Sequence, residues 1–229
     1  MLKHSKLQPT LSSGFTLVEL LIALSVMALL ALLSWRSIDG MSRAQIGLST
    51  RSDEILTLRA SLSQFKSDLD AMTETPRVSS LDWDGRVLRL TRLAAIPGEG
   101  LQVVAWTRRF DDGGKWLRWQ SPTATGYLDW RQSWEQAAAW AQNASVENRK
   151  HETFTLQLTD WQIFYFRNNA WSNPLSSAGA SAGQLPQGTA TPVSIPDGIR
   201  LVLNLPPNQG MAGKLTLDWV RPNLGGDKP

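Results

Sequence analysis

The feature that most constrains this chain is an apolar run near its start. From Phe15 to Trp35 the sequence holds twenty-one residues, of which only Glu19 is charged. At a helical rise of about 1.5 Å per residue, this run spans the roughly 30 Å hydrocarbon core of a bilayer. It is longer than the apolar stretch of a secretory signal peptide, and no small-residue cleavage site follows it. The run therefore predicts a transmembrane helix over residues 15–35.

Residues on either side of the run predict its orientation. The preceding segment carries Lys3 and Lys6, and basic residues accumulate on the cytoplasmic side of membrane helices. Arg36 lies on the far side and weakens this asymmetry, whereas Trp35 suits an anchor at the outer interface. We therefore expect a single-pass protein with a cytoplasmic N-terminus and the rest of the chain outside.

Glu19 is the anomaly within the run. A carboxylate at the bilayer centre costs about 2.5–3.5 kcal/mol on insertion scales. One interpretation is that Glu19 lies near the end of the span and reaches the interface. The other is that it meets a positive partner at the same depth. Cleavage after Gly14 would create an α-amino group on Phe15, which a neighbouring parallel helix could present to Glu19.

The residues around Gly14 carry a family resemblance. A basic leader ending in Gly14, followed by FTLVELLIAL, resembles the class III signal of type IV pilins and type II secretion pseudopilins. The resemblance implies that a prepilin peptidase of the inner membrane cuts between Gly14 and Phe15 and methylates Phe15. It also implies that Glu19, the fifth residue of the mature chain, is the assembly residue. This signal names the superfamily and not the member.

Composition excludes several classes of function. Without the leader, the chain carries 21 basic against 20 acidic side chains, so no nucleic-acid partner is expected. It contains no cysteine, and His151 is the one histidine beyond the leader. The stretch GASAG (179–183) matches a nucleophile-elbow pattern but sits among small residues rather than at a strand-to-helix turn. The DDGG stretch at 111–114 indicates a hairpin turn more than a calcium site. The sequence predicts no catalytic site, no metal and no cofactor.

Residues 36–75 continue the helical pattern beyond the membrane. Six apolar residues repeat at intervals of three and four and predict one narrow apolar face: Ile55, Leu58, Leu62, Phe65, Leu69 and Met72. Pro76 should stop the helix, because its ring clashes with the preceding turn. A coiled coil is the alternative, but the stripe covers too few heptads, so we expect this face to pack on a sheet.

The rest of the chain, residues 76–229, reads as a β-rich domain. Short apolar runs predict strands at 86–94, 101–110, 115–120, 198–205 and 213–221. Residues 152–168 predict either two strands or one long bent strand, and 128–144 predict a helix. Residues 172–197, rich in Ser, Gly, Ala and Pro, predict a mobile loop.

Tryptophan is unusually frequent, with eleven in the chain, ten of them beyond the membrane segment. Most are expected to fill the core of a β-rich domain. Tryptophan is also enriched at interface hot spots, and three lie near predicted loops. Trp130, Trp134 and Trp171 are therefore the candidate partner contacts.

The β-rich part carries a second, looser resemblance. The segments LRLTRLA, LQVVAWTRRF, KWLRWQ, LTDWQIFYFRNNAW and IPDGIRLVLNL are similar to the J-type minor pseudopilin of type II secretion. This implies an α+β pilin-like fold, with a long N-terminal helix packed on an antiparallel, incompletely closed barrel-like domain. It also implies a place in the inner membrane and periplasm, at the pseudopilus tip with the I-type and K-type subunits, followed by the H and G pseudopilins.

Two other functions fit parts of the sequence. The first is a minor pilin of a type IV pilus, which would prime assembly or serve adhesion or DNA uptake. A nearly neutral mature chain argues mildly against DNA uptake. The second is a membrane-tethered binding or hydrolytic domain, for which the sequence offers no site.

Overall fold

The structure is a computed structural model that describes residues 14–96, 98–110, 113–176, 194–207 and 210–222. Its longest element is α1 (Leu17–Asp70), a helix of 54 residues. Residues 1–50 and 51–229 form two compact units. The leader before Gly14, the GASAG stretch, the first two residues of DDGG and most of the predicted loop 172–197 lie outside the described residues.

The first unit contains the beginning of α1. Every described side chain from residue 14 to residue 50 is exposed, and most of those before Arg36 are apolar. Two serines of this stretch bond to the helix backbone. Ser25 Oγ donates to the Leu21 carbonyl at 2.8 Å, and Ser37 Oγ donates to the Leu33 carbonyl at 2.9 Å. Such internal hydrogen bonds are what a helix surrounded by lipid requires.

The second unit contains the end of α1, where the predicted apolar face is buried. Leu58, Phe65 and Leu69 are buried, and Leu62 packs against the same core. The helix ends at Asp70, earlier than the predicted limit of residue 75. The reason is that the next residues join a sheet edge: Met72 forms a β-bridge with Arg92, and Thr73 N donates to the Thr91 carbonyl at 3.2 Å.

Sheet A is an antiparallel meander in which neighbouring strands follow one another along the chain. Its strands, in spatial order, are β1 (Leu81–Trp83), β2 (Val87–Leu93), β3 (Leu101–Arg109), β4 (Lys115–Gln120) and β5 (Glu152–Gln157). Two helices connect β4 to β5, namely α2 (Tyr127–Gln142) and the short α3 (Val146–Arg149). The predicted hairpin at DDGG joins β3 to β4, with Gly113 and Gly114 in the left-handed region.

Sheet B is antiparallel and has four strands. Their spatial order is β7 (Ala170–Ser172), β6 (Asp160–Arg167), β8 (Gly198–Leu205) and β9 (Gly213–Val220). The alternative left open for residues 152–168 is resolved, because β5 belongs to sheet A and β6 belongs to sheet B. The chain changes sheets at Leu158, whose N–H donates to the Gly114 carbonyl, while the Thr159 N–H donates to the Asn204 carbonyl.

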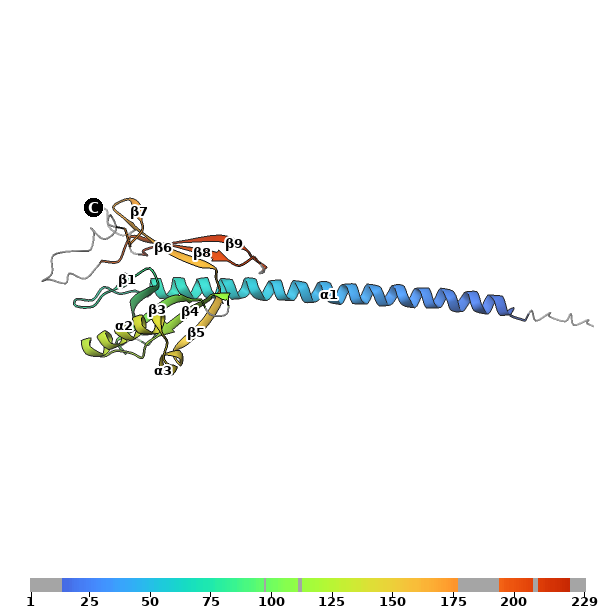
Figure 1. Cartoon of the computed structure of the whole chain (residues 1–229), viewed down its shortest axis with the longest axis horizontal. Helices are drawn as coiled ribbons and strands as arrows, with labels where there is room; N and C mark the ends of the chain where they lie inside the picture. The colour runs from blue at the N-terminus through green and yellow to red at the C-terminus, as the bar shows by residue number, and fades with distance from the viewer. Residues whose placement is uncertain (1–13, 97, 111–112, 177–193, 208–209, 223–229) are drawn as a thin grey trace, which may run out of the picture. The chain divides into compact units, whose positions relative to one another are not determined.

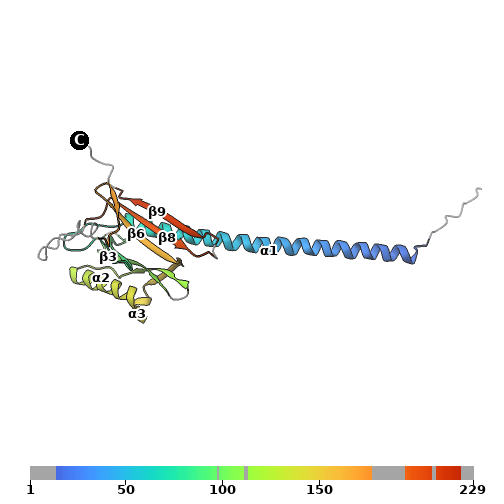
Figure 2. The ribbon, with the colours of Figure 1, turned by 45° about the horizontal axis from the view of Figure 1, so that its top comes forward.

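The last turns of α1 lie between the two sheets (Figure 1). One core cluster joins Phe65 of α1 to Trp106 of sheet A and Ile199 of sheet B. A second cluster covers the other face of sheet A with α2, which Figure 2 shows on the side away from α1. The predicted α+β fold, a long helix packed on antiparallel strands, is confirmed. In the part of the chain that the structure describes, the strands form two open sheets and no closed barrel.

The middle of strand β3 is buried on both faces, which explains the apolar run at residues 103–106. Val104 and Trp106 point to the cluster around α1, whereas Val103 and Ala105 point to the cluster under α2. Successive side chains of a strand face opposite sides, so a strand covered on both sides needs apolar residues at every position. Residues 103–107 are all buried.

Aromatic rings fill the space between α1 and the sheets. The Phe65 ring meets Trp106 edge-on, with centroids 5.3 Å apart, and Trp106 contacts Trp116 at 4.4 Å. Trp161 of sheet B also contacts Trp116, with ring centroids 6.0 Å apart. Eight of the ten tryptophans beyond the membrane segment are buried, so the prediction that most of them fill the core is confirmed.

Candidate functional site

The N-terminal end of α1 holds the predicted processing and assembly residues. Gly14 and Phe15 precede the helix, and a side chain at Gly14 would meet nothing within 4 Å. Phe15 is exposed. The predicted cleavage point therefore lies on an accessible, non-helical segment immediately before the apolar helix, as a peptidase would require.

Glu19 has a partner within its own chain, Thr16, which is not among its predicted contacts. Thr16 precedes the first helical residue, and its Oγ1 accepts a hydrogen bond from Glu19 N at 3.3 Å. In return, Glu19 Oε2 accepts from Thr16 N at 3.0 Å and from Thr16 Oγ1 at 2.8 Å. This reciprocal arrangement is a capping box, and the signal for it was the T-x-x-E spacing of residues 16–19.

The capping box leaves one oxygen of the carboxylate available. All three hydrogen bonds of this box use Thr16 Oγ1 or Glu19 Oε2. Glu19 Oε1 accepts no hydrogen bond from any residue that the structure describes. A carboxylate oxygen retains further lone pairs, so a second donor can approach Glu19 without displacing Thr16.

By length and composition, helix α1 is long and apolar enough to cross a membrane. No residue in its most apolar part is buried by the rest of the chain. Leu20, Leu24 and Met27, like their neighbours, are exposed. Water does not favour such a surface, because burying apolar area is worth about 25 cal/mol per Å². The exposed surface is therefore suited to lipid or to other apolar helices.

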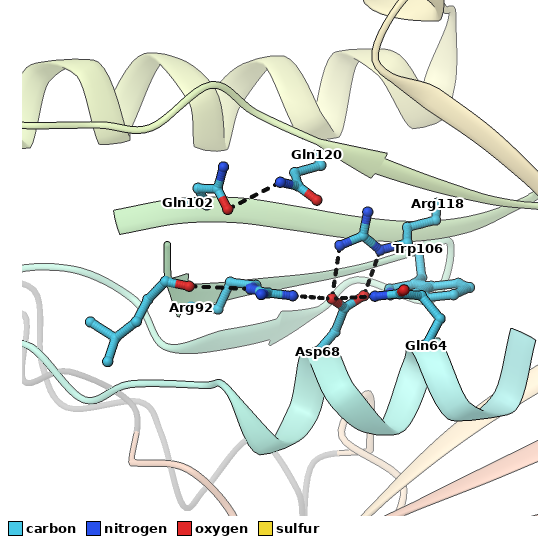
Figure 3. Close-up of polar contacts among 8 residues, drawn as sticks. Gln64, Asp68, Arg92, Gln102, Trp106, Arg118 and Gln120 are labelled. Carbon is cyan, nitrogen blue, oxygen red and sulfur yellow. Dashed lines mark hydrogen bonds and ion pairs between the residues drawn. The ribbon is translucent and has the colours of Figure 1, made fainter. Parts of the chain in front are cut away.

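A second polar site lies at the other end of α1, where Asp68 is 0% exposed. Figure 3 shows its carboxylate between α1 and sheet A, facing two guanidinium groups. Arg92 Nη1 donates to Oδ1 at 2.7 Å, and Arg118 donates from Nε to Oδ2 at 2.7 Å and from Nη2 to Oδ1 at 2.8 Å. Trp106 Nε1 donates to Oδ2 at 3.0 Å, and Gln64 Nε2 donates to Oδ1 at 3.2 Å.

The position of Asp68 explains why these partners are needed. The C-terminal end of a helix carries a partial negative charge, which disfavours carboxylates there. The last turn of α1 contains no basic residue, so cations must come from elsewhere. Arg92 of β2 and Arg118 of β4 supply them, and both guanidinium groups are largely buried. A buried charge with this set of donors fixes the position of α1 against sheet A.

Two further acids near the helix end connect to sheet B. Trp219 Nε1 of β9 donates to Asp70 Oδ1 at 2.7 Å. Glu74, just beyond the helix, accepts from Ile195 N at 2.9 Å and forms an ion pair with Arg221 at 3.3 Å. The stretch from Asp68 to Glu74 thus bonds to both sheets. The sequence predicts only an apolar stripe here, although three acids in seven residues are a visible signal of polar contacts.

The three candidate tryptophan contacts differ in accessibility. Trp130 is 5% exposed and its Nε1 donates to Thr91 Oγ1 at 2.9 Å, so the expectation that it forms a surface anchor is wrong. Trp134 is half-buried, with the Arg89 guanidinium over its ring. Trp171 is 36% exposed, and the Arg200 guanidinium lies 4.2 Å from its ring centroid. The indole N–H of Trp130 needed a buried acceptor, and Thr91 provides it.

Two comparisons with known proteins bear on the chain. A family model described as the prokaryotic N-terminal methylation motif matches residues 10–35. A chain of the solved GspK-GspI-GspJ complex from the enterotoxigenic Escherichia coli type 2 secretion system is similar, with a TM-score of 0.45 and 14% identity. That match covers 73% of this chain and 96% of the other. The motif confirms the predicted prepilin-type signal, and with the apolar helix it indicates a membrane-anchored protein.

Proposed function

We propose that this chain is a J-type minor pseudopilin of a type II secretion system. In this role it is a structural subunit of the pseudopilus tip that helps to initiate assembly and protein export across the outer membrane. Its single membrane helix crosses the bacterial inner membrane with the N-terminus in the cytoplasm and the β-rich domain in the periplasm. The methylation motif over residues 10–35, which includes the junction after Gly14 and Glu19, supports a subunit with a prepilin-type signal. The choice of the J type rests on the resemblance of the β-rich segments from LRLTRLA to IPDGIRLVLNL.

Processing is the first step of the proposed role. The prepilin peptidase cuts after Gly14, which removes the leader and leaves a free α-amino group on Phe15. Methylation of that amine keeps its positive charge, because a secondary amine remains basic. The mature chain then begins with Phe15 and Thr16, followed directly by α1.

Assembly follows by pairing of charges between neighbouring helices. Lipid gives apolar helices no hydrophobic reason to associate, so a polar pair sets both partner and register. The Phe15 amine of one subunit approaches Glu19 Oε1 of its neighbour, while Oε2 stays in the capping box with Thr16. Each charge then offsets part of the desolvation cost of the other.

The proposed partners are the I-type and K-type minor pseudopilins, with the H and G pseudopilins following below. Trp171 is the best accessible candidate for a contact with them, and Trp134 is the second. The test is to replace Trp171 with a photoreactive residue and to crosslink in living cells, with Phe154, exposed on sheet A, as the control position. Crosslinks from position 171 to the I-type or K-type subunit are expected. Crosslinks to minor pilins of a type IV pilus instead would contradict the proposal.

The role of Glu19 is tested by separating its charge from its capping function. Glu19→Leu removes both, whereas Glu19→Gln keeps an acceptor for Thr16 and removes only the charge. Both variants should insert and fold like the parent, but both should lose most of their crosslinking to other pseudopilins and reduce secretion at least about tenfold, the loss expected for a pair worth about 1.4 kcal/mol. If Glu19→Gln assembled as well as the parent, capping and not charge pairing would be the function of Glu19.

A further inference from the structure

The four outer edges of the two sheets differ in how they are protected. Native sheets blunt their edges by short strands, bulges or charges that point inward, because open edges recruit other strands. Strands β1 and β7 have three residues each, and β5 carries a register break opposite Trp116 and Leu117. Strand β9 has eight residues and pairs with β8 without a break. Among the described edges, β9 is thus the longest without a break, and its protection is limited to the exposed charges of Lys214 and Asp218.

The free backbone groups of β9 can be assigned from its pairing with β8. Arg221 N donates to the Asp197 carbonyl at 3.0 Å, just beyond the ends of the paired strands. In an antiparallel ladder, alternate residues direct both backbone groups to the same neighbour. Odd-numbered residues of β9 therefore bond to β8, and Lys214, Thr216 and Asp218 direct their N–H and C=O groups away from the sheet. Each of them can exchange two hydrogen bonds with an added strand.

The side chains of β9 define what an added strand must look like. Leu215 and Leu217 face the core and are partly exposed, so residues opposite them should be apolar. Lys214 and Asp218 are exposed on the outer face, where Asp218 already pairs with Arg200 of β8. Opposite charges across a pair of strands are favourable, so an acidic residue opposite Lys214 and a basic residue opposite Asp218 suit an added strand. A strand running antiparallel to β9 should therefore read basic, apolar, polar, apolar and acidic in its own direction.

We infer that the free edge of β9 is a docking site for an extended segment of another protein, which adds to sheet B as an antiparallel strand of this pattern. Residues 214–218 themselves read Lys-Leu-Thr-Leu-Asp, which is the pattern expected of the added strand. A second copy of this chain is therefore the alternative occupant. Two contacts show that β9 runs in the same direction as the end of α1. Just before β9, the Gly210 N–H donates to Glu54, and near the end of β9, Trp219 donates to Asp70, which lies later in the helix. Two copies joined at β9 would have their α1 ends antiparallel, whereas helices anchored alike in one membrane run parallel.

The site is tested on the full chain reconstituted in lipid nanodiscs. The probe is a capped, fluorescent peptide of the sequence Lys214–Val220, and its binding is followed by fluorescence anisotropy. Saturable binding is expected for the parent and for Thr216→Val. Thr216→Pro removes the N–H that points away from the sheet and leaves the hydrogen bonds to β8 intact. This variant should bind the peptide at least about tenfold more weakly. Thermal unfolding of Thr216→Pro checks that the chain is folded.

A charge exchange tests the proposed register without relying on proline. Lys214→Glu should weaken binding of the same peptide roughly fivefold, because its aspartate faces position 214. A peptide carrying lysine in place of that aspartate should bind Lys214→Glu better than it binds the parent. Equal binding of both peptides to both chains, or no saturable binding, would overturn the inference. Dimers of the full chain in detergent that Thr216→Pro abolishes would also overturn it, because the occupant would then be a second copy.

This inference rests on anchoring through α1 and not on the assignment to a secretion system. Its readout needs no other pseudopilin, whereas the crosslinking at Trp171 does. A chain that bound the peptide but crosslinked only to pilus subunits would retain the β9 site and lose the proposed function. The converse result would remove the β9 site alone.

Discussion

The two parts of α1 invert the usual relation between charge and burial. Residues 17–50 contain the most apolar stretch of the chain, yet all of them are exposed. Residues 51–70 are more polar, yet they include Phe65 at 1% and Asp68 at 0% exposure. Composition therefore does not decide which part the chain itself buries. The first part offers a surface for lipid and other helices, and the second part is held by the chain's own sheets.

The two parts also use their carboxylates differently. Glu19 lies at the positive end of the helix, where a carboxylate is favourable, and it keeps one oxygen available. Asp68 lies near the negative end, where a carboxylate is unfavourable, and both of its oxygens accept from charged or aromatic donors of sheet A. The first carboxylate keeps an oxygen available for a further donor. The second is committed to the fold.

The largest effect is expected at Asp68. Asp68→Ala leaves the Arg92 and Arg118 guanidinium groups without their shared acceptor in a buried position. Removing one partner of a buried ion pair typically costs about 3–5 kcal/mol, and this value is the expected loss in the free energy of unfolding. Urea unfolding of the full chain in detergent, followed by tryptophan fluorescence, measures it. Ser67→Ala, one residue away and exposed, should change the unfolding free energy by less than about 0.5 kcal/mol.

A smaller effect is expected for a charge placed on the apolar stripe. Leu62 is partly buried against the core cluster, whereas Leu56 on the same helix is exposed. Leu62→Asp should cost about 2 kcal/mol, because the new carboxylate loses water and gains no donor. Leu56→Asp is the matched control and should stay within about 0.5 kcal/mol of the parent. Equal stability of the two variants in the same urea titration would mean that this face of α1 does not pack on the sheets.

The smallest effect is expected at the surface of sheet A, from the pH dependence of Glu152. Burial raises the pKa of Glu152, but hydrogen bonds from Arg109 and Trp140 outweigh it and hold the pKa below its usual value of 4.5. A carboxyl with a lowered pKa stabilises the fold above its unfolded pKa and loses that contribution as the pH falls through its folded pKa.

Glu152→Gln should therefore lower the free energy of unfolding at neutral pH, by less than about 1 kcal/mol because the pair is partly solvated. The difference from the parent should shrink as the pH falls through the lowered pKa of Glu152, because the parent's carboxyl then becomes protonated. Glu135→Gln removes an exposed ion pair with Arg131 and is the control. A difference between parent and Glu152→Gln that stayed constant from pH 7 to pH 3 would rule out this linkage.

Much of the fold could be predicted because it follows from local periodicity. The stripe from Leu58 to Leu69, the hairpin at Gly113 and the strands β8 and β9 all appear as regular patterns of apolar residues or turn residues. Two short strands, β1 and β7, were missed, since three residues are too few to show alternation. Their positions depend on pairing with β2 and β6.

The polar contacts could not be predicted in the same way. Asp68 meets Arg92 and Arg118 only after sheet A has formed, from positions 24 and 50 residues away in sequence. Likewise, nothing in the local sequence shows that Trp130 faces inward to Thr91, whereas Trp171 lies on an exposed edge strand. The capping box of Thr16 and Glu19 is the exception. It is local, and its spacing was visible in the sequence.

The most direct test of the account is the chemical state of the N-terminus of the protein purified from its native membranes. If the first part of α1 is a processed assembly helix, as proposed, intact-mass and peptide mass spectrometry should find a chain that begins at Phe15 and carries one N-methyl group. Gly14→Glu, which places a charged side chain at the junction, should accumulate with its leader intact. A native chain that kept residues 1–14, or that was cut after residue 35, would contradict the proposed processing, because Phe15 would then carry no free α-amino group to pair with Glu19 of a neighbour.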